Sequence, residues 1–305
     1  MHRDSIDDLR KLFVGLDKKV NINGKGRIVP INFDNAATTP PFKRVVKRVL
    51  ETTEYYGSIA RGDGQKSQYC SDLYEECRRY ILKYFNAPEE IYTAIFVGNT
   101  TDGLNKLSNI LINNKEDIVI TTRMEHHSND LPWRNKCDLK YVEVNEDGRI
   151  NINEIKELIE RYKEKVKYIT ITGASNVTGY INDIRKISGL IHKYGGKIIV
   201  DGAQLVPHKK IYMYKKDSLE NIDFLVFSGH KIYAPFGSGA IIGLRKDFNN
   251  NLPDTKGGGT VEYVIDNNQL WLNTPEKNEA GTPNLFGAVA IMEAMKEIEK
   301  IGFER

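Results

Sequence analysis

The chain has 305 residues, of which 40% are hydrophobic and 28% are charged, and its formal net charge is +3. This composition is typical of a globular protein with one large core or two smaller ones. The small net charge, with acids and bases interspersed, argues against a nucleic-acid-binding protein, and no apolar run is long enough to span a bilayer.

The cysteines and the N-terminus indicate the compartment. Cys70, Cys77 and Cys137 are an odd, sparse set without the spacing of metal ligands, which predicts free thiols in a reducing environment. The first stretch, MHRDSIDDLRKLFVGL, mixes acids with its apolar residues and so does not resemble a signal peptide. We therefore expect a cytoplasmic protein that has no metal site.

Short apolar runs alternate with helical patterns along the chain. Runs rich in β-branched or aromatic residues predict buried strands at 92–97, 117–121, 167–172, 197–200 and 223–227. Helical patterns cover 102–111, 152–165, 183–195 and 285–305, and a sixth strand at 240–244 is expected to be antiparallel, at an edge or in a hairpin. This alternation predicts an α/β protein with a mostly parallel sheet covered by helices on both faces.

In such sheets the side chains that do chemistry follow the carboxyl ends of the strands. After the first strand, GNTTDGLN offers Thr100, Thr101 and the free amides of a helix start to an anion, although a plain helix cap explains the same residues. After the second strand, MEHHSNDLPW places His126 and His127 on a loop. They suit ring stacking or acid–base chemistry, or they are simply hydrogen-bonded, partly exposed histidines.

The next three strand ends add further polar groups. GASNVTG places Asn176 and Thr178 at the same edge, where a simple turn is an equal explanation. Asp201 directly follows an apolar strand, with Gln204 close behind, and a buried carboxylate there needs a cation or several donors unless it caps a helix. The last stretch, FSGHKIYAPFGSG (227–239), delivers Ser228, His230 and Lys231.

Together, an anion site, a flat platform, a carboxylate and a lysine predict one kind of ligand. It is a phosphorylated, flat, basic heteroaromatic aldehyde, and pyridoxal 5′-phosphate (PLP) has each of these features. In PLP chemistry a lysine forms a Schiff base, and a carboxylate keeps the pyridine nitrogen protonated so that the ring accepts electrons. A lysine at the tip of a buried strand is then tolerated because the imine removes its charge.

The sequence resembles the class V aminotransferase-fold enzymes, most closely the group II cysteine desulfurases and selenocysteine lyases. The matching stretches, which occur in the family's order, are DNAATTP (34–40), FVGNTTDGLN (96–105), MEHHSNDLPW (124–133), SNVTGYIN (175–182), VDGAQLVPH (200–208), FSGHKIYAPFGSG (227–239), GGGTV (257–261) and EAGTPN (279–284). The resemblance implies the type I PLP-transferase fold with a PLP-binding large domain over 31–284. It also implies a helical N-terminal segment over 1–30 that belongs with the small domain, and a long helix over 285–305 that leads toward a C-terminal domain largely absent here.

The resemblance also implies a role for each matching residue. Lys231 would be the Schiff-base lysine, and His126 would stack on the ring. Asp201 would pair with the pyridine nitrogen, while Asn176 and Gln204 would lie near the ring's phenolic oxygen. The phosphate would be held by Thr100, Thr101, Ser228 and His230. Thr282 would reach across a dimer interface to the phosphate of a partner subunit, so a homodimer is implied.

The implied activity is that of a PLP-dependent cysteine desulfurase, which converts the small amino acid L-cysteine to L-alanine and passes the sulfur to a cysteine thiolate. A sulfur-acceptor protein is a further partner of such enzymes. In the family the nucleophilic cysteine and an arginine that binds the substrate carboxylate lie in the C-terminal domain, and no cysteine here matches that position. Two alternatives stay open: another PLP reaction, such as that of an aminotransferase, epimerase or lyase, and a PLP-binding dimer that is catalytically incomplete.

Overall fold

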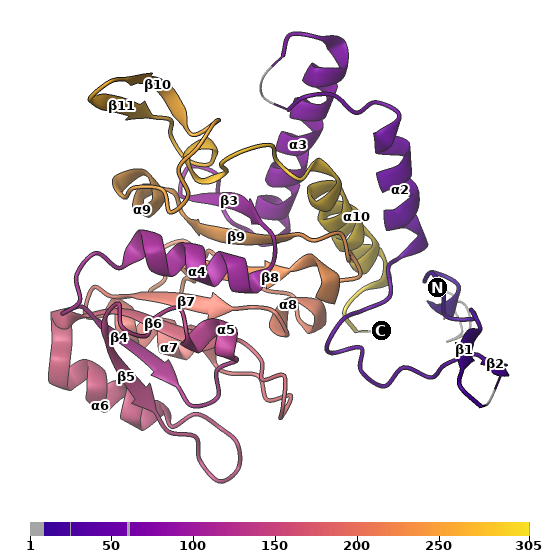
Figure 1. Cartoon of the computed structure of the whole chain (residues 1–305). Coiled ribbons are helices and arrows are strands. Elements are labelled where there is room, and N and C mark those ends of the chain that lie inside the picture. Colours follow the sequence, from indigo (N-terminus) through magenta and orange to yellow (C-terminus); the bar gives the residue numbers. More distant parts are fainter. Residues whose placement is uncertain (1–8, 25, 60–61, 305) are drawn as a thin grey trace.

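The computed structural model describes residues 9–24, 26–59 and 62–304. At its centre is a seven-stranded sheet of order β3-β9-β8-β7-β6-β4-β5, and two small hairpins stand out from the rest (Figure 1). The strands are β3 (Tyr92–Val97), β4 (Ile118–Thr122), β5 (Asp138–Val142), β6 (Val166–Thr172), β7 (Lys197–Asp201), β8 (Phe224–Ser228) and β9 (Gly239–Leu244). Strands β4 to β8 are parallel to one another, and β9 is antiparallel to both of its neighbours.

The sheet confirms the α/β class, and every expected strand is present to within a residue at each end. The antiparallel direction of β9 is confirmed, but its expected place at an edge or in a hairpin is wrong, because β9 lies inside the sheet between β3 and β8. Its sequence fits that interior place, since Ile241 and Ile242 are both buried, on opposite faces. The sequence did not predict β5, in which Asp138 and Lys140 interrupt the apolar pattern of this edge strand.

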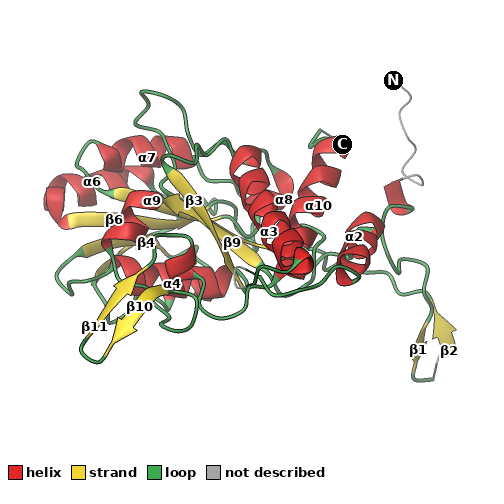
Figure 2. Ribbon diagram, turned by 90° about the horizontal axis from the view of Figure 1, so that it is seen from above, coloured by secondary structure: helices red, strands yellow, loops and turns green. Residues whose placement is uncertain are grey.

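Side chains of the central strands alternate between two hydrophobic clusters, so both faces of the sheet are covered. Val226 packs into one cluster and Leu225 into the other. The first face carries α4 (Thr100–Leu111), α5 (His127–Asp130) and α9 (Arg245–Asn250). The second carries α6 (Ile152–Tyr162) and α7 (Ile184–His192), and Figure 2 shows these two helices across the sheet from α4.

Three further helices form a layer beside β9 and β3. Helix α10 (Leu285–Ile301) packs against both α2 (Lys43–Thr53) and α3 (Gln65–Tyr84). Cys70 and Cys77 of α3 are fully buried in one cluster with Val289 and Met292 of α10, so these two cysteines serve packing. No helix within the described residues is both long and apolar enough to cross a membrane.

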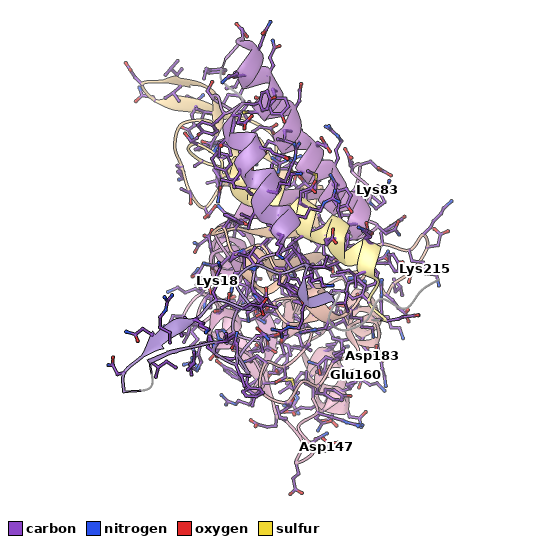
Figure 3. The ribbon with its side chains drawn as sticks, turned by 90° about the vertical axis from the view of Figure 1, so that its right-hand side faces the viewer. Lys18, Lys83, Asp147, Glu160, Asp183 and Lys215 are labelled. Carbon is purple, nitrogen blue, oxygen red and sulfur yellow. The ribbon has the colours of Figure 1, made fainter. Side chains whose placement is uncertain are left out.

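The N-terminal segment differs from the expectation of a helix over 1–30. Strand β1 (Val20–Ile22) pairs antiparallel with β2 (Gly26–Ile28) in a hairpin, and Gly24 and Gly26 adopt positive φ values of 76° and 69° that favour glycine. Residues 1–8 and 25 lie outside the described residues. A second hairpin, β10 (Val261–Ile265) with β11 (Asn268–Trp271), was not predicted either. Charged side chains are spread over the surface, as Lys18, Asp147 and Lys215 illustrate in Figure 3.

Candidate active site

A cavity of about 610 Å³ opens at the carboxyl ends of the parallel strands. The expected cofactor-binding residues line it, with the exception of Thr282. They are Thr100, Thr101, His126, Asn176, Asp201, Gln204, Ser228, His230 and Lys231. The sheet brings them together because each lies at or just after the end of β3, β4, β6, β7 or β8, and these ends meet at one edge. His127 and Thr178, which the sequence also placed at this edge, are not among the lining residues.

The N-terminus of α4 forms one end of the cavity. Asn99 caps the helix by accepting a hydrogen bond from the Asp102 backbone amide at 2.9 Å, so neither threonine is needed as the cap. The Thr100 amide donates to Ser228 Oγ at 2.8 Å, and the two hydroxyls are 2.7 Å apart. Amides in the first turn of a helix lack intrahelical partners and carry its positive partial charge. This end of the cavity therefore suits a phosphate.

Asp201 is a buried carboxyl group at the end of β7, with 3% of its surface exposed. Its Oδ1 accepts a hydrogen bond from the Ala203 amide at 2.9 Å. Burial raises the pKa of Asp201 above its usual value, while that hydrogen bond, Lys231 and His126 act in the opposite direction. The structure shows no ion pair between Asp201 and a described cationic side chain. A protonated ring nitrogen in the cavity would supply the missing cation, so this residue fits PLP.

Lys231 ends the short 3₁₀ helix Gly229–Lys231 that follows β8. Burial lowers the pKa of its ammonium group, and Asp201 opposes that shift. A lowered pKa leaves more of the side chain as the uncharged amine, which is the nucleophilic form. Burial, and then the charge of Lys231, lower the pKa of the neighbouring His230, whose Nδ1 lies 3.2 Å from Thr38 Oγ1. His230 is therefore held as neutral imidazole beside the lysine.

Ser128 is a cavity residue that the sequence reasoning missed. Its hydroxyl lies 2.9 Å from His126 Nδ1 and 2.7 Å from Thr101 Oγ1, so it joins His126 to the first turn of α4. Its amide also donates to His126 Nδ1 at 3.1 Å. The motif MEHHSNDLPW contained this serine, but its neighbours across the cavity follow only from the fold.

The stretch DNAATTP also reaches the cavity, through Asp34, Ala36 and Ala37. Gln204 Nε2 donates to the Ala36 carbonyl oxygen at 2.8 Å, which ties this stretch to the loop after β7. The sequence reasoning recognised the motif but assigned it no role. Its place in the structure makes it one wall of the cavity.

Thr282 lies in a neighbouring cavity of about 270 Å³, which shares Gly98, Gly237 and Ser238 with the first. Its loop is fixed by Glu279, which accepts hydrogen bonds from the Phe96 amide at 2.7 Å and the Tyr74 hydroxyl at 3.0 Å and pairs with Arg78 at 2.9 Å. These bonds hold the loop beside β3, and Thr282 itself is exposed. Within one chain, Thr282 is not part of the main cavity.

The three cysteines lie away from the cavity. Cys70 and Cys77 are buried in α3, and burial raises the pKa of Cys137 to about 11, which disfavours its thiolate. In the part of the chain that the structure describes, no group of His, Cys, Asp and Glu side chains is arranged to hold a metal ion.

The family follows from a comparison with known proteins. The aminotransferase class-V family model matches residues 31–305. The chain belongs to the class-V aminotransferase family. A protein of this family from Borreliella burgdorferi, named "Probable cysteine desulfurase", is 36% identical over 99% of this chain and 72% of its own length. "Cysteine desulfurase" from Wigglesworthia glossinidia brevipalpis is 32% identical over 98% of this chain and 73% of its own length.

Solved structures agree with this family membership. The apo structure of cysteine desulfurase from Thermococcus onnurineus NA1 superposes with a TM-score of 0.81 at 31% identity, covering 89% of this chain and 68% of that one. The cysteine desulfurase CsdA from Escherichia coli superposes with a TM-score of 0.78 and covers 99% of this chain and 73% of that one. At 24% identity, the second likeness concerns the fold alone. Both confirm that this class-V family member has the fold that its sequence motifs implied.

Proposed function

We propose that this class-V family member binds PLP and acts on L-cysteine as a cysteine desulfurase does, with L-alanine as a product. One observation carries the proposal: Lys231, whose pKa is lowered, and Asp201, whose pKa is raised, line the same cavity. The N-terminus of α4 lies in that cavity too. Relatives named cysteine desulfurase, 32% and 36% identical over nearly the whole chain, support the choice of substrate.

Each part of the cofactor would contact different residues of the cavity. Asp201 would hold the proton of the pyridine nitrogen, and His126 would lie against the ring. Asn176 and Gln204 would lie near the phenolic oxygen. The phosphate would be bound by Thr100, Thr101, Ser228 and His230 together with the amides of α4. When bound, the cofactor supplies an electron-accepting ring that stabilises negative charge at the Cα atom of an amino acid.

Lys231 has two tasks in this proposal. Its amine would attach the cofactor covalently until the amino group of the substrate takes its place. The released amine would then take a proton from the substrate Cα and return protons to the substrate. Attachment of the cofactor and removal of the Cα proton need the uncharged amine, which burial favours by lowering the lysine pKa. The ammonium group formed by that removal is then the form that returns a proton to the substrate.

The sulfur must leave on a thiol that is not one of the three cysteines. Cys70 and Cys77 are buried, and the raised pKa of Cys137 makes it a poor nucleophile. We therefore propose that an acceptor thiolate from outside the cavity attacks the substrate sulfur. The products are then a persulfide on the acceptor and, after proton return by Lys231, L-alanine. A sulfur-acceptor protein would be the natural partner in this step, and a small thiol can take its place in an assay.

We further propose that the chain acts as a homodimer in the cytoplasm. The place of Thr282, exposed and next to its own main cavity, suits a residue that serves the phosphate of a second copy. The free cysteines suit a reducing compartment.

Product analysis tests this proposal. Purified protein, supplied with PLP, L-cysteine and dithiothreitol as the sulfur acceptor, is expected to form alanine and sulfide in equal amounts. Lys231→Ala, assayed in parallel, should form neither. Pyruvate and ammonia instead would indicate a lyase, a keto acid would indicate an aminotransferase, and cofactor binding without any product would indicate a catalytically incomplete PLP-binding dimer.

A further inference from the structure

Glu125 is an acidic residue next to His126 that has no part in the mechanism above. It lies in the turn between β4 and α5 and is only partly exposed to solvent. One carboxyl oxygen accepts a hydrogen bond from Thr122 Oγ1 at 2.7 Å, and the other accepts one from Asn129 Nδ2 at 2.6 Å. These two partners lie on either side of His126 in the sequence. The carboxyl group therefore ties together the two ends of the turn that presents the histidine.

The orientation of Asn129 is fixed by the core of the protein. Its Oδ1 accepts hydrogen bonds from Thr170 Oγ1 of β6 at 2.6 Å and from the indole of Trp133 at 3.3 Å. An indole N–H can only donate, so Oδ1 must face Trp133, and Nδ2 must face Glu125. Asn129, Thr170 and Trp133 are all fully buried. Through Asn129, Glu125 is anchored to the central sheet rather than to a mobile surface.

A carboxyl group at this place is costly. Burial raises the pKa of Glu125 to about 8, and the nearby Asp201 acts in the same direction, while the hydrogen bonds with the side chains of Thr122 and Asn129 and with the backbone of Thr172 oppose the shift. An apolar side chain would avoid this cost. What it could not supply is a hydrogen bond to each end of the turn. The geometry therefore accounts for a polar side chain where burial alone favours an apolar one.

The opposite side of His126 is held by a different set of bonds. Its Nδ1 is bonded by Ser128, which in turn contacts Thr101 in the anion site. Glu125 fixes the backbone of the turn, and Ser128 fixes the rotation of the ring. The hydrogen bonds of Glu125 and those of Ser128 cannot replace each other. The position of the His126 ring depends both on the backbone of the turn and on the side-chain torsion angles.

We propose that Glu125 is a positioning residue for His126: by bridging Thr122 and Asn129 it holds the turn so that the histidine ring faces the cofactor cavity. The inference rests on the proposed function only in naming PLP as the ligand that the ring contacts. Glu125 touches neither cofactor nor substrate in this scheme. In this proposal its effect on PLP binding passes through His126 and not through its weaker electrostatic interaction with Asp201, and that restriction makes the proposal testable.

The test compares Glu125→Gln, Glu125→Met and His126→Ala with the double variant Glu125→Met/His126→Ala. Glutamine can accept from Asn129 and donate to Thr122 Oγ1, so it should bind PLP within about twofold of the parent protein. Methionine fills the space without making hydrogen bonds and should weaken PLP binding about tenfold, with a shift of the cofactor's visible absorption band toward that of His126→Ala. The matched control is Glu143→Met, since Glu143 pairs with Arg123 of the same turn but is exposed.

The double variant tests whether Glu125 affects PLP binding only through His126. If Glu125 acts only through His126, the double variant should bind PLP no more weakly than His126→Ala alone, to within about twofold. Losses that multiply would overturn the proposal, because they would show an effect of Glu125 on PLP binding that bypasses the histidine. The melting temperature of each variant is recorded as well. It distinguishes an effect on His126 from a general loss of stability, which would not shift the absorption band toward that of His126→Ala.

A second readout needs no cofactor. In the apoprotein, the NMR signals of the His126 ring can be identified by their absence from His126→Ala. They should move toward those of free histidine in Glu125→Met and stay in place in Glu125→Gln. Unchanged ring signals in Glu125→Met would overturn the proposal even if the parent protein failed to bind PLP, which would be a failure of the proposed function instead.

Discussion

Thr100 and Ser228 lie 128 positions apart in the sequence, yet their hydroxyl oxygens are 2.7 Å apart. The contact joins the N-terminus of α4 to the end of β8. Lys231 follows three residues after Ser228, at the end of the short 3₁₀ helix. The first turn of α4 and the lysine are thus joined through a direct contact between two elements of the central fold. In the proposed site, the distance between the phosphate and the amine would be set by the sheet and not by a separate loop.

Removing this hydroxyl should loosen the cofactor. We expect Ser228→Ala to weaken PLP binding about tenfold, because it removes both the acceptor of the Thr100 amide and one charge-assisted donor to the phosphate. Fluorescence titration of the apoprotein measures the affinity. Ser218→Ala, at a serine outside the cavity, is the control. Equal affinity of both variants would show that Ser228 does not contact the phosphate.

Asp201 should matter more for catalysis than for binding. Asp201→Asn keeps the size of the side chain but loses the charge that would hold a proton on the ring. We expect PLP still to bind, while alanine formation falls by roughly 100-fold, the value of a hydrogen bond between charged groups. Steady-state assays at saturating PLP give the rate, and Asp147→Asn at an exposed site is the matched control. A variant with the parent's rate would remove Asp201 from the site.

The raised pKa of Glu125 predicts that the free energy of unfolding depends on pH. Its pKa is about 8 in the folded chain and near 4.5 when unfolded, so the unfolded chain releases this proton first as the pH rises. The favourable contribution is complete below about pH 4.5 and is lost as the pH rises through about 8. Urea unfolding should therefore show that Glu125→Gln gains stability relative to the parent across this window, by on the order of 2 to 4 kcal/mol. A difference between the two that does not change with pH would contradict the raised pKa.

Thr282 predicts a site shared between subunits. Thr282→Ala should weaken PLP binding about tenfold, although Thr282 does not line the main cavity of its own chain. Mixing it with an excess of Lys231→Ala chains should restore PLP affinity at the Lys231-containing sites, because each then receives a threonine from its partner. No recovery in mixed dimers would mean that Thr282 acts within its own chain or not at all.

Much of this site could be predicted from the sequence, because parallel strands bring their carboxyl ends to one edge. Once the apolar runs before Asp201 and Lys231 were identified as strands, the proximity of the two residues followed from topology alone. The same reasoning placed Thr100 and His126. Their roles toward PLP remain predictions, since the structure shows where these side chains lie and not what they bind.

The parts that escaped the sequence depend on tertiary contacts. Ser128 and Glu125 stood in a quoted motif, but their partners Thr101 and Asn129 are set by how α4, α5 and β6 pack. The interior place of β9 depends on strand order, which periodicity does not encode. The β1–β2 hairpin replaced an expected helix because Gly24 and Gly26 support a turn between residues that alternate in a strand.

The central claim is that Lys231 is the residue that attaches PLP. The PLP-loaded protein is reduced with borohydride and digested, and the peptides are analysed by mass spectrometry. This locates the lysine that carries a phosphopyridoxyl group. We predict that the modification falls on Lys231 alone and disappears in Lys231→Ala. Modification of a different lysine, such as Lys106 in the neighbouring cavity, or of none, would contradict the account.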